Sequence, residues 1–270
     1  MPTSLAFTAT TPSNYLALAL DVTSPVSITA AFAAALARFH RIDVVVNNAG
    51  YGLAGALEEL SDEQIAHQMD VNFFGVVRIT RAAICAMRES NSPPGGLIQQ
   101  ITSTCGHVGM PLLSSYCASK WAVEGFTESL AKEMQPEWGI RFMCVEPGGF
   151  RTDWAGRSMA FRDNERKLAA YAHLDARKAV ERMAQVQRGD PAKGAEAIYR
   201  LTLLEGPPLR VPMGKEAFER MEEKIRHYSE TYRQCEDVAK YTDILASIYC
   251  LAASTSATHN AETSCNIREY

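Results

Sequence analysis

Tyr116 and Lys120, four residues apart, are the pair in this sequence best suited to proton transfer. Residues at this spacing project from the same face of a helix. A nearby ammonium group can lower the pKa of a phenol from about 10 toward neutrality. Ser103, thirteen residues before the tyrosine, offers a hydroxyl that can hydrogen-bond a substrate oxygen. These three groups predict proton transfer to or from a carbonyl or an alcohol, and so an oxidoreductase.

The Tyr-x-x-x-Lys spacing is short, and it also occurs by chance in proteins of this length. The competing interpretation is a surface helix with a half-buried tyrosine and a solvated lysine. The elements and motifs around the pair therefore have to decide between the two.

The hydrophobic pattern predicts strands that alternate with helices. Five short apolar segments are typical of strands buried in a parallel sheet: residues 15–22, 43–47, 97–103, 141–146 and 209–212. Longer segments have the pattern of helices: residues 25–39, 62–87 with a break, 114–134 and 191 to about 205. Thr23 or Ser24 can cap the first helix, and Asp190-Pro191 starts the last one. This order of elements predicts an α/β fold with a Rossmann-like, doubly wound parallel sheet.

The remaining segments complete the expected organisation. Residues 155–189 are charged, helical in pattern and interrupt the alternation, so we expect a helical lid over the substrate. Residues 1–14 are polar and predict a disordered lead-in, whereas residues 241–270 predict a loose tail. The domain itself is predicted over residues 15–240.

Composition excludes several classes of function. The chain has 270 residues and is 47% hydrophobic, enough for a large core in one domain. A net charge of −4, without a dense Lys/Arg stripe, argues against a nucleic-acid partner. No apolar stretch is long enough to span a bilayer, so no membrane association is expected.

The cysteines and the first basic residue indicate the compartment. The seven cysteines are scattered and have no Cys-x-x-Cys spacing: Cys85, Cys105, Cys117, Cys144, Cys235, Cys250 and Cys265. This pattern predicts reduced thiols rather than disulfides or a metal site. The first basic residue is Arg38, which argues against a signal peptide. We therefore expect a soluble, cytoplasmic protein.

A glycine motif at residues 50–55 matches G-x-G-x-x-G but is interpreted as a decoy. A dinucleotide-binding fingerprint needs a helix at the third glycine and then a strand ending in an acidic residue. Here the following segment, residues 70–87, is helical in pattern. The stretch from Asn47 to Gly50 is better explained as a turn at the carboxyl end of a strand, where ligands bind in open α/β sheets.

Six motifs in this order and spacing closely resemble the short-chain dehydrogenase/reductase family. They are Leu20-Asp21-Val22, Asn47-Asn48-Ala49-Gly50, Val71-Asn72 with Gly75, Ser103, Tyr116-x-x-x-Lys120 and Pro147-Gly148-Gly149-Phe150-Arg151-Thr152. The resemblance covers residues 15–155 most strongly. It implies an NAD(P)-dependent enzyme that interconverts a carbonyl and a secondary alcohol.

The resemblance also implies the roles of the catalytic residues. Tyr116 is expected to exchange a proton with the substrate oxygen. Lys120 is expected to lower the tyrosine's pKa and to bind the nicotinamide ribose, and Ser103 to hold the carbonyl oxygen. Asn72, by itself an ordinary polar helix residue, is expected to fix a local helix distortion and a water that links Lys120 to solvent.

The same resemblance implies the residues that hold the coenzyme. They are Asp21, Val22, Asn48, Ala49, Gly50, Tyr116, Lys120, Pro147, Gly148, Phe150 and Thr152. Subgroup resemblance favours NADP, with NAD as the alternative. No metal is expected.

Individual residues in these motifs have simpler interpretations. Asp21 can end a strand and start a turn. Ser103 can be a strand-end hydroxyl, with Thr102 or Thr104 competing for its role, although the spacing to the tyrosine selects Ser103. His107, near the expected site, is a candidate second acid, but a lone loop histidine is more often solvated or locally bonded.

One part of the family's pattern is not found in this sequence. The family opens with a strand, Thr-Gly-x-x-x-Gly-x-Gly, a helix and a second strand, and this unit cradles the pyrophosphate. This sequence begins just before what would be the third strand, and residues 1–14 contain no glycine. We expect either a truncated version of a longer active enzyme or a chain expressed in this form with weak or no coenzyme binding.

Two other functions are weighed against the oxidoreductase. One is a pseudoenzyme or interaction subunit that pairs with another chain, and the other is a regulatory sensor that binds coenzyme without turnover. The enzyme interpretation implies a small-molecule carbonyl or alcohol as substrate and a homo-oligomer, dimer or tetramer. Trp154, Met159, Phe161 and Tyr171 predict a pocket for a medium-sized, partly apolar substrate.

Overall fold

The computed structural model describes residues 14–163 and 166–242. The chain divides into two compact units, residues 1–221 and 222–270, and the first unit holds the sheet described below. Most of the expected lead-in (residues 1–13) and of the expected tail (residues 243–270) lies outside the described residues. The domain extent of residues 15–240 stays a prediction.

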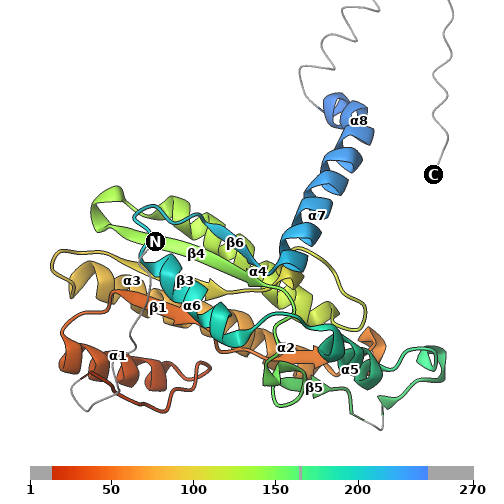
Figure 1. The fold of residues 1–270 in the computed structure, drawn as a ribbon, viewed down its shortest axis with the longest axis horizontal. Coiled ribbons are helices and arrows are strands. Elements are labelled where there is room, and N and C mark those ends of the chain that lie inside the picture. Colours follow the sequence, from red (N-terminus) through yellow and green to blue (C-terminus); the bar gives the residue numbers. More distant parts are fainter. Residues whose placement is uncertain (1–13, 164–165, 243–270) are drawn as a thin grey trace, which may run out of the picture. The chain divides into compact units, whose positions relative to one another are not determined.

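The first unit is built on a four-stranded parallel sheet with the strand order β1-β3-β4-β6 (Figure 1). The strands are β1 (Val44–Asn47), β3 (Gly96–Ile101), β4 (Ile140–Pro147) and β6 (Arg210–Met213). Val45 of β1 pairs in register with Ile98 of β3, and Ile98 pairs with Phe142 of β4. Because all strands are parallel, their carboxyl ends lie along one edge of the sheet, where α/β proteins bind ligands.

Helices cover both faces of this sheet. They are α1 (Pro25–Phe39), α3 (Gly75–Glu89) and α4 (Ser114–Glu133) on one face and α6 (Pro191–Thr202) on the other. Successive side chains of a strand point to opposite faces, so Ile98 packs with Met87 of α3, whereas Leu97 packs with Ile198 of α6. The predicted Rossmann-like, doubly wound α/β architecture is therefore confirmed.

The strand predicted over residues 15–22 is wrong. Residues 15–21 have no regular secondary structure, and Tyr15 and Leu18 are exposed. An extended segment forms a strand only when a neighbouring strand takes up its backbone hydrogen bonds, and none of the described strands pairs with it. The other four predicted strands and all four predicted helices are found.

The helix predicted over residues 62–87 contains the break that was expected. It consists of α2 (Asp62–Met69) and α3, joined by a π-helical turn, η2 (Asp70–Phe74). A capping box fixes the start of α2. The Ser61 hydroxyl accepts a hydrogen bond from the backbone N–H of Gln64, and the Gln64 side-chain oxygen accepts one from the backbone N–H of Ser61. The start of α1 is likewise capped by Ser24.

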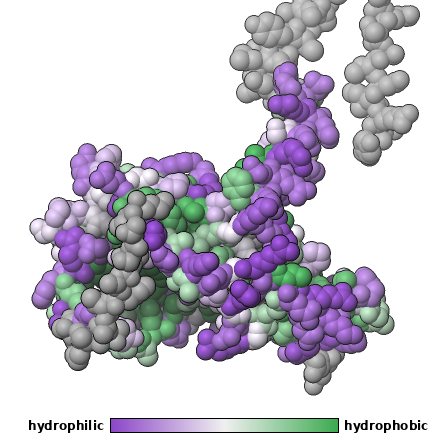
Figure 2. All heavy atoms as spheres, viewed as in Figure 1, coloured by the Kyte–Doolittle hydropathy of each residue, from purple (hydrophilic) through white to green (hydrophobic). Residues whose placement is uncertain are grey.

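The predicted helical insertion is helical only in part. A short strand, β5 (Met159–Phe161), pairs in parallel with β2 (Gly52–Ala54) and forms a small second sheet. The insertion then continues through η7 (Ala169–Tyr171) into α5 (Ala176–Val186). The outer side of α5 is hydrophilic (Figure 2), whereas its Val180 is buried.

The glycine motif at residues 50–55 is confirmed as a decoy. Its middle residues form β2, and the segment after it is the short turn η1 (Leu57–Glu59) rather than a long helix. The insertion is tied to this turn by an ion pair between Arg162 and Glu59, 3.0 Å apart. Both side chains are largely buried, so this pair holds β5 beside β2.

The remaining elements are short turns and two helices that were not predicted. They are η3 (Thr104–Gly106), η4 (Pro136–Trp138), η5 (Asp153–Ala155), α7 (Lys215–Gln234) and α8 (Glu236–Tyr241). Among the described residues, no helix combines the length and the apolar character needed to cross a bilayer.

Candidate active site

A cavity of about 430 Å³ opens at the carboxyl ends of the sheet strands. Nine of the predicted site residues line it: Asn48, Gly50, Ser103, Tyr116, Lys120, Pro147, Gly148, Phe150 and Thr152. They come from segments up to about a hundred residues apart in the chain. The fold thus brings most of the predicted catalytic and coenzyme residues to one place.

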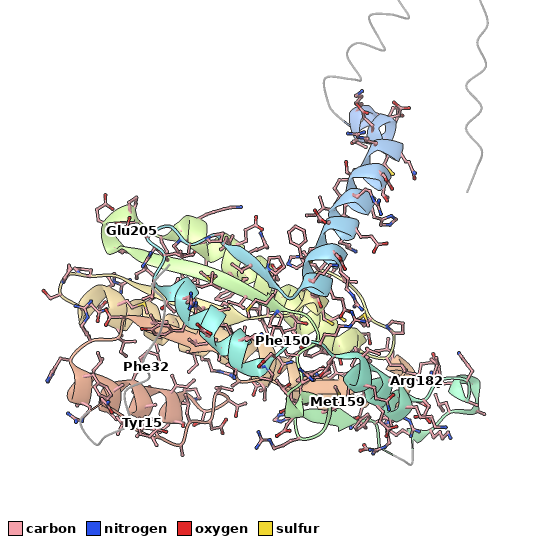
Figure 3. The ribbon with its side chains drawn as sticks, in the orientation of Figure 1. Tyr15, Phe32, Phe150, Met159, Arg182 and Glu205 are labelled. Carbon is pink, nitrogen blue, oxygen red and sulfur yellow. The ribbon has the colours of Figure 1, made fainter. Side chains whose placement is uncertain are left out.

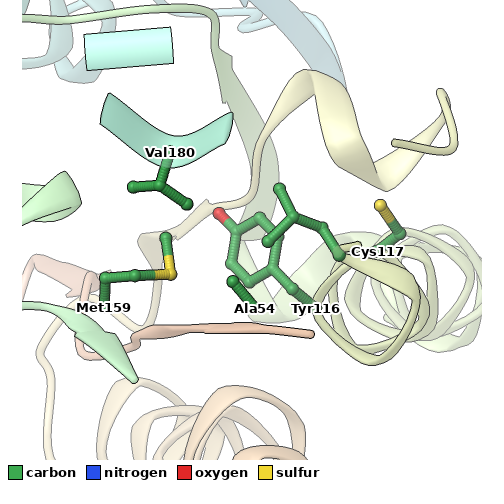
Figure 4. Close-up of a cluster of buried hydrophobic side chains, with 6 residues drawn as sticks. Ala54, Tyr116, Cys117, Met159 and Val180 are labelled. Carbon is green, nitrogen blue, oxygen red and sulfur yellow. The ribbon is translucent and has the colours of Figure 1, made fainter. Parts of the chain in front are cut away.

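Tyr116 is buried on α4, with only 6% of its surface exposed. Its ring packs over Ala54, and its hydroxyl points toward Val180 and Met159 (Figure 4). Ser103 lines the same cavity and favours the ionised form of the phenol, which lowers the pKa of Tyr116. Burial has the larger effect and raises the pKa of Tyr116 above its ordinary value.

Lys120 lies one turn further along α4 and is also buried. Its ammonium donates a hydrogen bond to the Ile101 carbonyl at 2.8 Å and lies 5.9 Å from the centre of the Tyr116 ring. Burial lowers the pKa of Lys120 to about 8. The expected lowering of the Tyr116 pKa by Lys120 is not found, because burial of the phenol dominates and raises that pKa.

Asn72 lies behind the cavity rather than in its lining. Its amide donates to the Tyr51 carbonyl at 2.9 Å and to the Ser119 hydroxyl at 3.1 Å, and its oxygen accepts from the Tyr51 N–H at 3.0 Å. A Cβ at Gly50 would come within 3.1 Å of the Asn72 oxygen, a tighter contact than most side chains make, so glycine favours this close approach. Asn72 thus ties the π-helical turn to α4, as expected. The water that would link Lys120 to solvent stays a prediction.

On the other side of the cavity, Gly148 and Phe150 follow β4. A Cβ at Gly148 would lie 3.2 Å from the Cβ of Ala217, so the glycine lets the first turn of α7 approach the strand end. The Phe150 ring lies beside α6, against Gly194 (Figure 3). The Thr152 hydroxyl caps the turn η5. All three residues line the cavity.

Three predicted coenzyme residues do not line the cavity: Asp21, Val22 and Ala49. The Asp21 carboxylate accepts hydrogen bonds from the backbone and the hydroxyl of Thr23, at 2.8 and 2.7 Å. This is a local turn of the kind that aspartate favours before a helix, and it matches the simpler interpretation of Asp21. The contact of these three residues with adenosine stays a prediction.

His107 belongs to a buried ion-pair cluster with Glu124, Glu146 and Arg210. Its Nε2 lies 3.1 Å from Glu146 Oε1 and 3.4 Å from Glu124 Oε2, and Arg210 donates to Glu124 at 3.0 Å. Burial opposes ionisation of the ring, but the two carboxylates outweigh it and raise the pKa of His107 to about 9. His107 does not line the cavity, so it is locally bonded rather than a second acid.

Comparison with known proteins identifies the family. The sequence profile of the family described as short chain dehydrogenase matches residues 5–163. An uncharacterised oxidoreductase of Schizosaccharomyces pombe is 39% identical over 213 residues, which are 77% of this chain and 70% of that protein. This chain belongs to the short-chain dehydrogenase family.

Solved structures agree with this assignment. A short-chain dehydrogenase from Streptomyces avermitilis has a TM-score of 0.76 and 34% identity, over 86% of this chain and 83% of that one. Another, from Burkholderia phymatum and in complex with NAD, has a TM-score of 0.56 and 26% identity, over 67% of this chain and 66% of that one. This short-chain dehydrogenase is accordingly an oxidoreductase enzyme.

The outer part of the dehydrogenase's cavity contains residues that were not predicted: Met110, Leu113, Met183, Val186, Gln187, Glu216 and Arg220. Of the four predicted lid residues, only Trp154 lines the cavity, while Met159 is buried against Tyr116. One signal was available, because Val180, Met183 and Val186 recur every three residues and so share one face of a helix. No comparable pattern in the sequence indicates that Glu216 and Arg220 of α7 line the cavity.

Proposed function

We propose that this short-chain dehydrogenase interconverts a carbonyl and a secondary alcohol, with a nicotinamide coenzyme and with Tyr116 as the proton donor and acceptor. The observation that carries the proposal is that Ser103, Tyr116 and Lys120 line the wall of one cavity, with the Lys120 ammonium 5.9 Å from the centre of the Tyr116 ring. Two hydroxyls in the wall of one cavity suit a single substrate oxygen.

In the reductive direction, Ser103 and Tyr116 both donate hydrogen bonds to the carbonyl oxygen, and Tyr116 then gives up its proton. Because burial raises its pKa, Tyr116 is protonated at neutral pH, as a proton donor must be. The Lys120 ammonium, 5.9 Å from the ring centre, offsets the charge left on the phenolate. A nicotinamide coenzyme, when bound, would supply the hydride for the carbonyl carbon.

The residues present fit the nicotinamide half of the coenzyme. Gly50 and Gly148 both line the cavity, and Lys120 lies within reach of a ribose hydroxyl placed there. Phe150 and Thr152 would contact the nicotinamide ring. NADP is the coenzyme we propose, with NAD as the alternative, which is the coenzyme in the Burkholderia phymatum relative. The adenosine contacts of Asp21, Val22 and Ala49 belong to the same proposal.

The outer cavity supports a medium-sized, partly apolar substrate. Met110, Leu113, Trp154, Met183 and Val186 supply its apolar wall. Such a wall favours an alkyl or aryl group next to the reacting carbonyl. A homo-oligomer and a cytoplasmic location stay predictions.

The proposal is tested by titrating the purified protein with NADPH and NADH while following nicotinamide fluorescence. We expect saturable binding, tighter for NADPH, followed by turnover in a panel of alkyl and aryl ketones. Saturable binding without turnover of any ketone would favour the regulatory sensor. Folded protein that binds neither coenzyme contradicts the proposal and favours an interaction subunit, which would purify as a stable complex with another chain.

A further inference from the structure

Helix α4 begins without a capping side chain, although Tyr116 lies in its first turn. The residue before the helix is Leu113, and its side chain makes no capping hydrogen bond. Leucine is a poor N-cap, and the first N–H groups of a helix have no partner within it. Tyr116 is the third residue of α4, so fraying of this turn would move its hydroxyl. A contact from outside the helix is needed to hold the proposed proton donor in place.

Gln68 of α2 makes such a contact. The Ser115 hydroxyl donates a hydrogen bond to the side-chain oxygen of Gln68 at 2.7 Å. Gln68 is 0% exposed and Ser115 is 6% exposed, so water does not compete for this bond. Because Ser115 directly precedes Tyr116, the bond fixes the backbone from which the tyrosine projects.

Gln68 is itself held by the loop that follows β1. Its side-chain amide donates to the Tyr51 carbonyl at 3.1 Å. Asn72, four residues after Gln68, donates to the same carbonyl at 2.9 Å. Tyr51 directly follows Gly50, which lines the cavity. Two buried amides therefore connect this loop to α4.

The second amide reaches α4 one turn after the first. Asn72 donates to the Ser119 hydroxyl at 3.1 Å, and that hydroxyl donates to the Tyr116 carbonyl at 2.7 Å. Ser115 and Ser119 are four residues apart and so lie on one face of the helix. Each directly precedes a proposed catalytic residue, Tyr116 or Lys120. The two hydrogen-bonded serines thus hold the backbone on both sides of the tyrosine.

We propose that Gln68 is a positioning residue, which fixes the first turn of α4 through Ser115 and so keeps the Tyr116 hydroxyl at the reacting oxygen. Gln68 does not line the cavity, so it acts only through other residues. Its hold on the helix stands on the hydrogen bonds, while its effect on turnover rests on the proposed function of Tyr116. The competing interpretation is a buried amide that has found its partners and contributes only to stability.

Gln68→Met separates these two roles, because it removes both hydrogen bonds and keeps the length of the side chain. Ser115 then loses its acceptor, and the first turn of α4 can fray. A misplacement of about 1 Å costs about a hundredfold in rate, so kcat with a ketone should fall by about ten- to a hundredfold. Asn72 still binds the N–H and the carbonyl of Tyr51. The KM for the coenzyme should therefore change little.

The matched control is Gln99→Met, the same substitution at another buried glutamine. Gln99 is also 0% exposed, and its amide donates to the Ile198 carbonyl of α6 at 3.3 Å. Both variants should lose stability in urea unfolding, but only Gln68→Met should lose kcat. Equal losses of kcat in the two variants would make Gln68 a structural residue and overturn the proposal.

Variants of Ser115 test the same hydrogen bond from its other end. Ser115→Ala removes the donor and should lower kcat about as much as Gln68→Met, whereas Ser115→Thr keeps a hydroxyl and should retain most of the wild-type rate. Because both losses arise from one bond, the double variant of Gln68→Met and Ser115→Ala should be little slower than Gln68→Met. Losses that multiply in the double variant would contradict a shared role.

Hydrogen exchange tests the hold on the helix without any assay of turnover. The Cys117 N–H donates to the Leu113 carbonyl at 2.8 Å, at the start of α4. This amide should exchange at least about tenfold faster in Gln68→Met and Ser115→Ala than in wild type and Gln99→Met. Unchanged exchange in Gln68→Met overturns the proposal. Wild-type protein that reduces no ketone contradicts the proposed function instead, and the exchange rates still decide whether Gln68 holds the turn.

Discussion

Two clusters of titratable side chains meet at helix α4, and only one of them lines the cavity. The reactive cluster of Ser103, Tyr116 and Lys120 opens onto the cavity, and its ammonium binds a backbone carbonyl. One turn further along, Glu124 belongs to the ion-pair cluster, where carboxylates face histidine and arginine and no member lines the cavity.

The two clusters have opposite effects on stability. Burial lowers the pKa of Lys120, so keeping its charge at pH 7 costs folding free energy. The carboxylates raise the pKa of His107, so its charge stabilises the folded state. Burial and an unusual pKa therefore do not by themselves identify a reactive group. Access to the cavity separates the residues for chemistry from those for stability.

The largest expected effect is that of Tyr116→Phe on turnover. Loss of the proton donor should lower kcat/KM with a ketone by about 10²–10⁴-fold. The free energy of unfolding should change by only about 1 kcal/mol, because a single hydroxyl is removed and the ring keeps its packing. Steady-state kinetics measure kcat/KM, and urea unfolding measures the free energy of unfolding. The control Tyr171→Phe, in the lid but outside the cavity lining, should keep wild-type turnover, and equal losses in both variants would contradict the role of Tyr116.

Glu146→Gln should lower stability rather than turnover. Removing one carboxylate from the ion-pair cluster leaves His107 and Arg210 less compensated and should cost about 3 kcal/mol of unfolding free energy. The matched control is Glu128→Gln, which removes a more exposed partner of Arg210 and should cost less than about 1 kcal/mol. A stability of Glu146→Gln equal to that of the control would show that the cluster contributes nothing.

Lys120→Met should separate function from stability within the reactive cluster. We expect kcat/KM to fall about a hundredfold, because the phenolate loses its compensating charge. At pH 7 the variant should be no less stable than wild type. Since the pKa of Lys120 is lowered from 10.5 to about 8, wild type should gain stability as the pH rises between these values, and the variant should not. Lys132→Met, an exposed substitution on the same helix, should show neither change.

The smallest expected effect is the pH dependence of His107→Gln. The pKa of His107 is raised from 6.5 to about 9, so its stabilisation is complete below pH 6.5 and is lost as the pH rises through 9. Wild type should exceed the variant by about 1–2 kcal/mol at pH 6, and the difference should vanish by pH 10. A difference that is constant over this range would mean that packing, not charge, stabilises the cluster.

The reactive cluster was predictable from the sequence because its residues occupy fixed positions at strand ends and on one helix face. Ser103 follows β3, and Tyr116 and Lys120 lie one turn apart on α4. The same reasoning failed for residues 15–22, because an apolar segment is a strand only if a partner strand lies beside it. No local signal indicates that partner.

The outer cavity and the ion-pair cluster depend on contacts between distant segments. Met183 approaches Met110, and Arg210 approaches Glu124, only because β2 pairs with β5 and β6 pairs with β4. The sequence shows a helical face on α5 but not the surface against which it packs. His107 could be recognised as locally bonded, whereas its partners could not be named.

Transfer of label from the coenzyme tests the reactive cluster most directly. The protein is incubated with reduced coenzyme that carries deuterium at the reactive position of the nicotinamide ring and with an aryl ketone, and the alcohol is analysed by mass spectrometry. We predict one deuterium on the carbinol carbon with wild type and Glu146→Gln, and almost no product with Tyr116→Phe. Unlabelled alcohol, or labelled alcohol formed equally fast by Tyr116→Phe, would contradict the assignment of the chemistry to this cluster.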